Sequence, residues 1–238
     1  MNLTAGPGGP EPAAGSEPED WRPDPAALGP VPWEDPSRPR LPGYFQTLVE
    51  VLRRPARFFA RPARGGPADP AAFGLITGTT GGLLVLFWST LLLLSYSHGL
   101  KSPMGWPRFD FLPGAAGVLT VGMALFPLVV LSKLALASLC LWGAAALLGA
   151  RVSWAPIWRL SCYSTAASAL ALVPVLGSLL VAPLTLFILH QGLRGALGMS
   201  AGRALGTLAV WLFLQILIAA VLVGGFLALL GLGLLFLG

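Results

Sequence analysis

Beyond residue 70 the chain alternates between long apolar stretches and short breaks that contain basic residues or proline. Over residues 71–238 the only acidic side chain is Asp110, and seven lysines and arginines accompany it. A water-soluble domain of this size needs a charged surface, whereas the hydrocarbon core of a bilayer requires none. The pattern therefore predicts an all-α fold, a polytopic bundle of transmembrane helices over residues 71–238.

The first apolar stretch, at about residues 71–94, carries a glycine at every fourth position. Gly74, Gly78 and Gly82 therefore share one face of the predicted helix. Because this face carries no side chains, a neighbouring helix can approach it closely. We predict that these three glycines form a helix-packing surface.

The segment from Phe111 to Ala150 is long for a single span. As one helix it would extend about 60 Å, twice the bilayer core of about 30 Å. We therefore divide it into two short spans, at about 114–131 and 134–150, with Lys133 at the membrane interface. The alternative is one span near 124–148 after a buried half-helix, which would leave Lys133 inside the membrane.

Two further spans follow, which gives five in total, with four or six as alternatives. The span at about 164–189 contains Pro174 and Pro183, so we expect a kink there. Before it, residues 151–163 are expected to be an interfacial segment anchored by aromatic and basic side chains, including Arg159 and Tyr163. The uncharged stretch after residue 203 holds one span, or a hairpin broken at Gly224–Gly225.

The N-terminal 64 residues divide into two segments of different composition. Residues 1–42 are rich in Pro, Gly, Ala and acidic residues and lack apolar periodicity, so a disordered tail is predicted. Residues 43–64 form a basic segment that begins with an amphipathic pattern. Its apolar positions recur at helical spacing, whereas Arg53, Arg54 and Arg57 occupy the other side. Pro55 should kink or end this helix near Arg54.

This juxtamembrane helix allows two interpretations, which the sequence leaves open. Its arginines could contact anionic headgroups while its apolar face enters the membrane interface. Alternatively, the apolar face could pack on the transmembrane bundle. The seven arginines between Arg38 and Arg64 predict a cytoplasmic N-terminus by the positive-inside rule. Since the basic residues lie next to the membrane, we expect lipid headgroups as partners and no nucleic acid.

The chain shows little sign of catalytic or metal chemistry. It contains two histidines and two cysteines, without the spacing of a metal site, a GxSxG elbow or an HExxH motif. We predict no catalytic, cofactor-binding or metal-binding residues, no cofactor, and a protein that is not an enzyme.

Several short motifs occur in an order that resembles the bacterial branch of the Yip domain family of multi-pass membrane proteins. The resemblance covers about residues 32–225. It rests on PWE at 32–34, Thr47, PxxFF at 55–59, the glycine-rich first span, CYS at 162–164, VPVLG at 173–177, GLR at 192–194, GMS at 198–200 and RAL at 203–205. It implies five spans, a cytoplasmic N-terminus and a C-terminus across the membrane. Eukaryotic members are trafficking factors that bind small Rab GTPases, and bacteria lack that machinery, so this role does not carry over.

These observations predict a multi-pass protein of the bacterial cytoplasmic membrane that acts as a non-enzymatic scaffold or adaptor. Its expected partners are the bilayer with its anionic headgroups, and a membrane protein or a second copy of the chain. The alternative function is a small transporter or channel, which the prolines of the 164–189 span favour.

Overall fold

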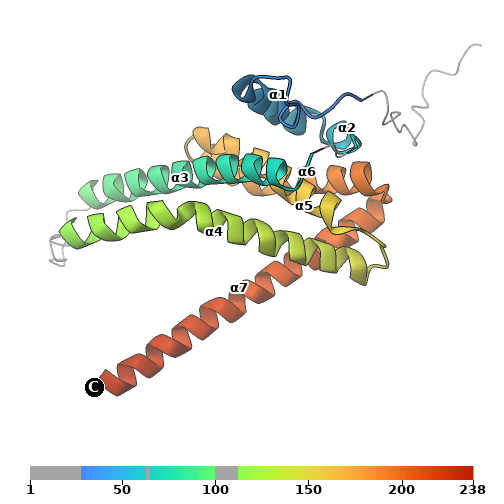
Figure 1. Ribbon diagram of the computed structural model, residues 1–238. Helices are drawn as coiled ribbons and strands as arrows, with labels where there is room; N and C mark the ends of the chain where they lie inside the picture. The colour runs from blue at the N-terminus through green and yellow to red at the C-terminus, as the bar shows by residue number, and fades with distance from the viewer. Residues whose placement is uncertain (1–27, 63–64, 100–111, 238) are drawn as a thin grey trace, which may run out of the picture.

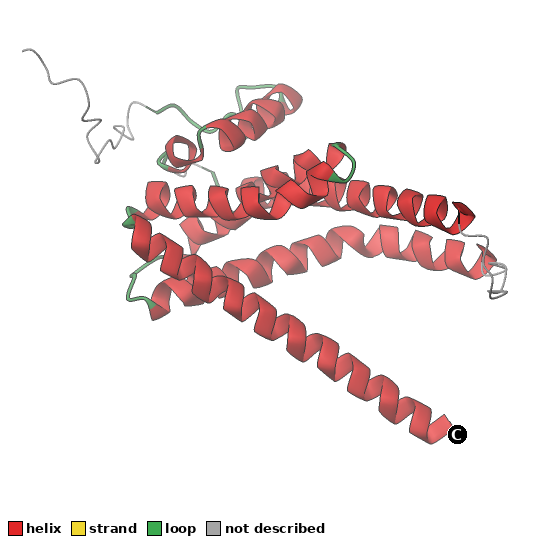
Figure 2. Cartoon of the chain, turned by 180° about the vertical axis from the view of Figure 1, so that it is seen from behind, coloured by secondary structure: helices red, strands yellow, loops and turns green. Residues whose placement is uncertain are grey.

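The computed structural model describes residues 28–62, 65–99 and 112–237, and within them it is built from helices and loops without a strand (Figure 2). The long helices are α3 (Ala68–Gly99), α4 (Leu112–Leu147), α6 (Leu176–Leu197) and α7 (Ala201–Leu237). Each is long and apolar enough to cross a membrane, over Ala68–Leu92, Gly122–Leu147, Leu176–Leu197 and Ala201–Gly225. The prediction of an all-α fold is confirmed, and four of its helices have the length and composition of membrane spans.

The predicted division of the chain around Lys133 is wrong, because α4 continues without a break from Leu112 to Leu147. No helix-breaking residue lies next to Lys133, and Pro127 is accommodated inside the helix. An interruption in an apolar environment would leave backbone groups without partners, which favours a continuous helix. Lys133 is exposed on the surface of α4, within its apolar segment.

The predicted span at 164–189 is a tight hairpin. Its first arm joins α5 (Trp154–Ser164) to the 3-10 helix η2 (Thr165–Leu172), and α6 forms its second arm. The chain reverses around Pro174, which cannot continue a helix, and Val175 has a φ of 59°. At Gly177 a Cβ atom would lie 1.8 Å from the carbonyl oxygen of Leu170, so only glycine fits at this closure.

Close contacts between helices fix the directions in which they run. Along α3, a Cβ at Gly74, Gly78 or Gly82 would approach Leu134, Val130 or Phe126 of α4, at 3.1, 2.8 and 2.4 Å. The two helices are therefore antiparallel. The predicted glycine surface lies against α4, and Gly74 also approaches the backbone of Cys162 in α5.

The other helices follow the same alternation. Gly74 and Gly81 of α3 approach Cys162 and Ser168, so α5–η2 runs parallel to α3. In α7, Trp211 Nε1 donates to the carbonyl of Ala137, 3.0 Å away, and Gly206 lies near Leu148. Five consecutive segments, α3, α4, α5–η2, α6 and α7, therefore run in alternating directions (Figure 1).

The last helix, α7, passes through Gly224–Gly225 without a turn, so the alternative hairpin at this point is not formed. Its C-terminal part projects away from the other helices (Figure 1). The side chains of Phe213, Ile216 and Val221 are exposed there. A surface of this kind suits contact with lipid tails rather than water.

Candidate functional site

The most polar part of the described molecule is a pair of short helices at its N-terminal side. These are α1 (Arg40–Arg53) and α2 (Pro55–Phe59), which lie over the first turns of α3 and the last turns of α6 (Figure 1). The prediction that Pro55 ends the first helix is confirmed. Arg54 leaves the helical region, with φ −141° and ψ 60°, and Pro55 opens α2.

A segment before α1 crosses over this helix and holds it. The backbone N–H of Trp33 donates to Thr47 Oγ1 at 3.0 Å, and a Cβ at Gly43 would lie 2.6 Å from the carbonyl oxygen of Pro32. Val31 and Trp33 are buried. The structure thus differs from the predicted disordered tail over residues 28–42, because these apolar side chains find a surface that composition does not reveal. Residues 1–27 of that tail lie outside the described residues.

Polar and aromatic contacts tie α1 to the start of α3. Trp33 Nε1 donates to the carbonyl of Asp69 at 2.7 Å, and the hydroxyls of Tyr44 and Thr77 lie 3.0 Å apart. The rings of Trp33 and Tyr44 also contact Phe73, with centroids 6.3 and 5.1 Å away. Each hydroxyl or indole group therefore keeps a hydrogen bond while its apolar part is buried.

The short helix α2 packs into a groove on α6 that two glycines create. A Cβ at Gly192 would meet the ring of Phe59 at 2.9 Å, and one at Gly195 would lie 2.4 Å from the carbonyl oxygen of Ala56. Phe58 and Phe59 are buried in the same apolar cluster as the helices of the bundle. The α1–α2 pair is therefore part of the folded core.

A buried charge pair completes this attachment. Arg159 Nε donates to Glu34 Oε1 at 3.2 Å, the Tyr163 hydroxyl donates to the same oxygen at 2.7 Å, and Arg159 also donates to the carbonyl of Arg61 at 2.8 Å. The side chains of Arg159 and Glu34 are 7% and 1% exposed. The expectation that Arg159 and Tyr163 anchor the chain at the membrane interface is wrong, because both are buried.

The arginines of this region differ in whether they have a counter-ion. Near the start of α1, Arg38 pairs with Asp35 at 3.1 Å and Arg40 lies 3.5 Å from Asp69. Hydrogen bonds from Ser37 lower the pKa of the Asp35 carboxyl below its ordinary value, which keeps this partner of Arg38 charged. At the other end of α1, Arg61 donates to Glu50.

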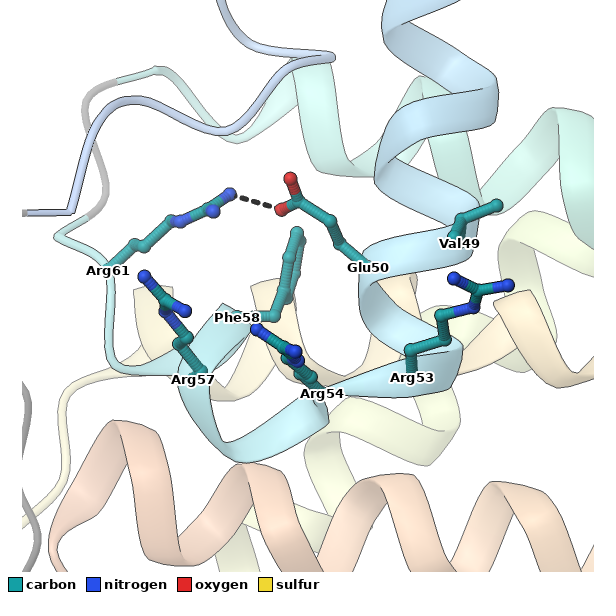
Figure 3. Close-up of a pocket in the computed structure, with 7 residues that line it drawn as sticks. All are labelled: Val49, Glu50, Arg53, Arg54, Arg57, Phe58 and Arg61. Atoms are coloured by element: carbon teal, nitrogen blue, oxygen red, sulfur yellow. Dashed lines mark hydrogen bonds and ion pairs between the residues drawn. The ribbon is translucent and has the colours of Figure 1, made fainter.

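The remaining basic side chains, Arg53, Arg54 and Arg57, form no ion pair within the described residues. All three are exposed and line a cleft between α1 and α2 of about 370 Å³ (Figure 3). We call it the arginine cleft, and its lining residues are Val49, Glu50, Arg53, Arg54, Arg57, Phe58 and Arg61. Four guanidinium groups and one carboxylate give this cleft a net charge of +3.

The cleft has the chemistry of an anion site. Guanidinium groups present planar pairs of N–H donors that match the oxygens of phosphate and carboxylate groups. Arg61, held by Glu50 and lying over the Phe58 ring at 5.9 Å, has a fixed position at the edge. The predicted membrane-surface residues Arg53, Arg54 and Arg57 are thus together in space, and the sequence alone did not identify Arg61 as their neighbour.

The described residues contain no group of three or more His, Cys, Asp or Glu placed to hold a metal ion. Comparison of the chain with protein-family models, with characterised proteins and with solved structures gives no significant match.

Proposed function

We propose that this protein is a Yip-like scaffold or adaptor of the bacterial cytoplasmic membrane, which organises the membrane or partner proteins without catalysing a reaction. The observation that carries the proposal is the rigid attachment of α1–α2. Contacts to α3, α5 and α6 hold this pair from the inside, while Arg53, Arg54 and Arg57 stay exposed on its outer side. A ligand bound on that side would be held at a set position relative to the transmembrane helices.

We further propose five spans, formed by α3, α4, α5–η2, α6 and α7, with the N-terminus in the cytoplasm. The 11 residues of α5 and the eight of η2 extend about 32 Å together, comparable with a bilayer core of about 30 Å. The alternating helix directions support a crossing by this arm.

The distribution of basic residues supports the same topology. With α4 as one span, the loops that contain Arg151 and Ser200 join the α1–α2 pair on one side of the membrane. Arg151, Arg194 and Arg203 then lie on the side of the N-terminal arginines, as the positive-inside rule requires. The division of α4 into two spans would instead have placed Arg151 on the opposite side.

A photocrosslinking experiment in native membranes tests the adaptor function. A photoreactive residue at the exposed Gln46 of α1 should give reproducible adducts with a discrete protein, or with a second copy of the chain. The matched control is the exposed, lipid-facing Leu179 of α6. Only lipid adducts at both positions would contradict the adaptor function.

The helix interruption at the hairpin around Pro174 favours the alternative, a small transporter or channel, because transporters use interrupted helices near their substrate sites. The tip residues Leu172, Val173 and Val175 are apolar and exposed. Ion conductance or solute flux across proteoliposomes of the purified protein, lost in a Gly177→Ala variant that still folds, would support transport over the adaptor function.

A further inference from the structure

The arginine cleft contains more positive charge than the protein itself neutralises. The acidic side chains around α1 pair with Arg38, Arg40 and Arg61. The three arginines left without an ion pair, Arg53, Arg54 and Arg57, all line one cleft (Figure 3). Like charges that line one cleft repel one another, so an anion in the cleft would stabilise the arrangement.

An apolar stripe begins at the same cleft. On α1, Leu41, Phe45 and Val49 follow at intervals of four residues and are 67%, 53% and 45% exposed. They form one line of about 12 Å on the helix surface that the bundle does not cover. Val49 belongs to both features, since it also lines the arginine cleft.

We propose that the arginine cleft is a binding site for the phosphate group of an anionic phospholipid, and that the apolar stripe contacts the acyl chains of the same molecule. This inference rests on the proposed function, because it identifies a lipid ligand for the α1–α2 surface. A soluble phosphate would use the arginines alone. A phospholipid uses both neighbouring features, and the volume of about 370 Å³ is at the lower end of small-molecule sites.

The chemistry of the guanidinium group provides a test that distinguishes a phosphate site from a merely basic surface. A general attraction to anionic lipid depends on charge, which lysine supplies as well as arginine. A phosphate bound in the cleft depends on paired N–H donors, which lysine lacks. Replacement of arginine by lysine should therefore separate a built phosphate site from non-specific attraction.

The test uses the purified, delipidated full chain in detergent, titrated with phosphatidylglycerol, phosphatidylcholine or inorganic phosphate and analysed by native mass spectrometry. The wild-type chain should bind phosphatidylglycerol at least about tenfold more tightly than phosphatidylcholine. Arg54→Gln/Arg57→Gln should weaken phosphatidylglycerol binding about tenfold or more, because one charge-assisted hydrogen bond accounts for that factor. Arg54→Lys/Arg57→Lys should weaken it at least about threefold.

Two further variants complete the design. Arg151→Gln/Arg203→Gln removes the same charge from exposed positions outside the cleft and should leave binding unchanged within about twofold. Phe45→Ser should weaken binding of the lipid without changing any competition by inorganic phosphate, since it alters only the apolar stripe. All substituted side chains are exposed, so the fold should persist, which gel filtration checks.

Several results would overturn the proposal. Equal losses in the cleft variant and the Arg151/Arg203 control would show non-specific attraction. Unchanged lipid binding in the lysine variant would refute a phosphate site that depends on guanidinium geometry. If inorganic phosphate bound the cleft as tightly as phosphatidylglycerol does, the cleft would be assigned to a soluble anion. The adaptor function is tested separately, because protein adducts at Gln46 in a variant that no longer binds lipid would preserve it.

Discussion

The buried pair between Glu34 and Arg159 gives the sharpest test of how α1–α2 is attached to the bundle. A Glu34→Gln variant keeps the size of the side chain and an oxygen that accepts from Tyr163. It removes the negative charge opposite Arg159, whose side chain is 7% exposed. Breaking a buried pair on one side costs about 3–5 kcal/mol, because the remaining charge is left desolvated without compensation.

We therefore expect Glu34→Gln to lower the free energy of unfolding by about 3 kcal/mol, at the lower end of that range because Arg159 also donates to the carbonyl of Arg61. Arg159→Met should cost a similar amount, since it leaves Glu34 charged at 1% exposure. The double variant leaves no buried charge at this position. Its loss should be smaller than the sum of the single losses by about 2 kcal/mol.

Equilibrium unfolding of the purified chain in mixed micelles, with rising SDS fraction, measures these differences. Arg38→Met serves as the matched control, because its pair with Asp35 is exposed and screened by solvent, so its loss should be much smaller. Losses that add within about 0.5 kcal/mol in the double variant would refute the coupling between Glu34 and Arg159. A loss no larger than that of the control would show that this pair does not hold the helices together.

Four further outcomes are expected. Gly177→Ala should lower thermal stability in detergent by the equivalent of at least about 1–3 kcal/mol, because its Cβ would overlap the Leu170 carbonyl. Gly143→Ala is the control and should not lower stability, since the space around Gly143 is open. Equal stability of the two variants would contradict the hairpin closure. Gly78→Leu should likewise damage assembly, measured as folded yield, more than the exposed Leu92→Ala, and equal yields would speak against the packing of α3 on α4. Lys133→Leu should raise the free energy of unfolding by about 1 kcal/mol or more, because a charge on a lipid-facing helix surface is costly even when its side chain reaches toward the interface. A lower free energy of unfolding would instead show that Lys133 has a polar partner or role. A periplasmic reporter should be inactive when fused at residue 65 and active when fused at the C-terminus, and any other pattern refutes five spans with a cytoplasmic N-terminus.

The sequence by itself determined the solvent of this protein and the kind of elements it forms. The single acidic residue after position 70 matches a surface in lipid better than one in water, and the lengths of the apolar stretches identify helices able to cross a bilayer. Local chemistry also fixed the end of α1, since Pro55 lacks a backbone N–H and restricts the residue before it. These properties depend on composition and on neighbouring residues, so they can be predicted from the sequence alone.

Tertiary structure decided which surfaces are inside. The sequence placed the apolar positions of α1, of which Phe45 is one, on a single helical face, and it placed Arg159 among the interfacial anchors. In the fold Phe45 is exposed, Thr47 is buried, and Arg159 pairs with Glu34, 125 residues away along the chain. Hydropathy ranks Thr and Arg as poor core residues, but a hydrogen-bond partner at the right position reverses the cost of burying them.

Contacts in the folded structure, which the sequence does not show, also decide the helix count and the make-up of the arginine cleft. Total length suggested two spans around Lys133, whereas α4 is one continuous helix in contact with α3 and α7. A helix longer than the bilayer core is accommodated by tilting or by local thickening of the bilayer. Which arginines remain without a counter-ion depends on where Asp35, Glu50 and Asp69 lie in space. Electrostatic pairing acts over a few ångströms, and each arginine has several carboxylates within reach along the chain, so the folded structure specifies which pairs form.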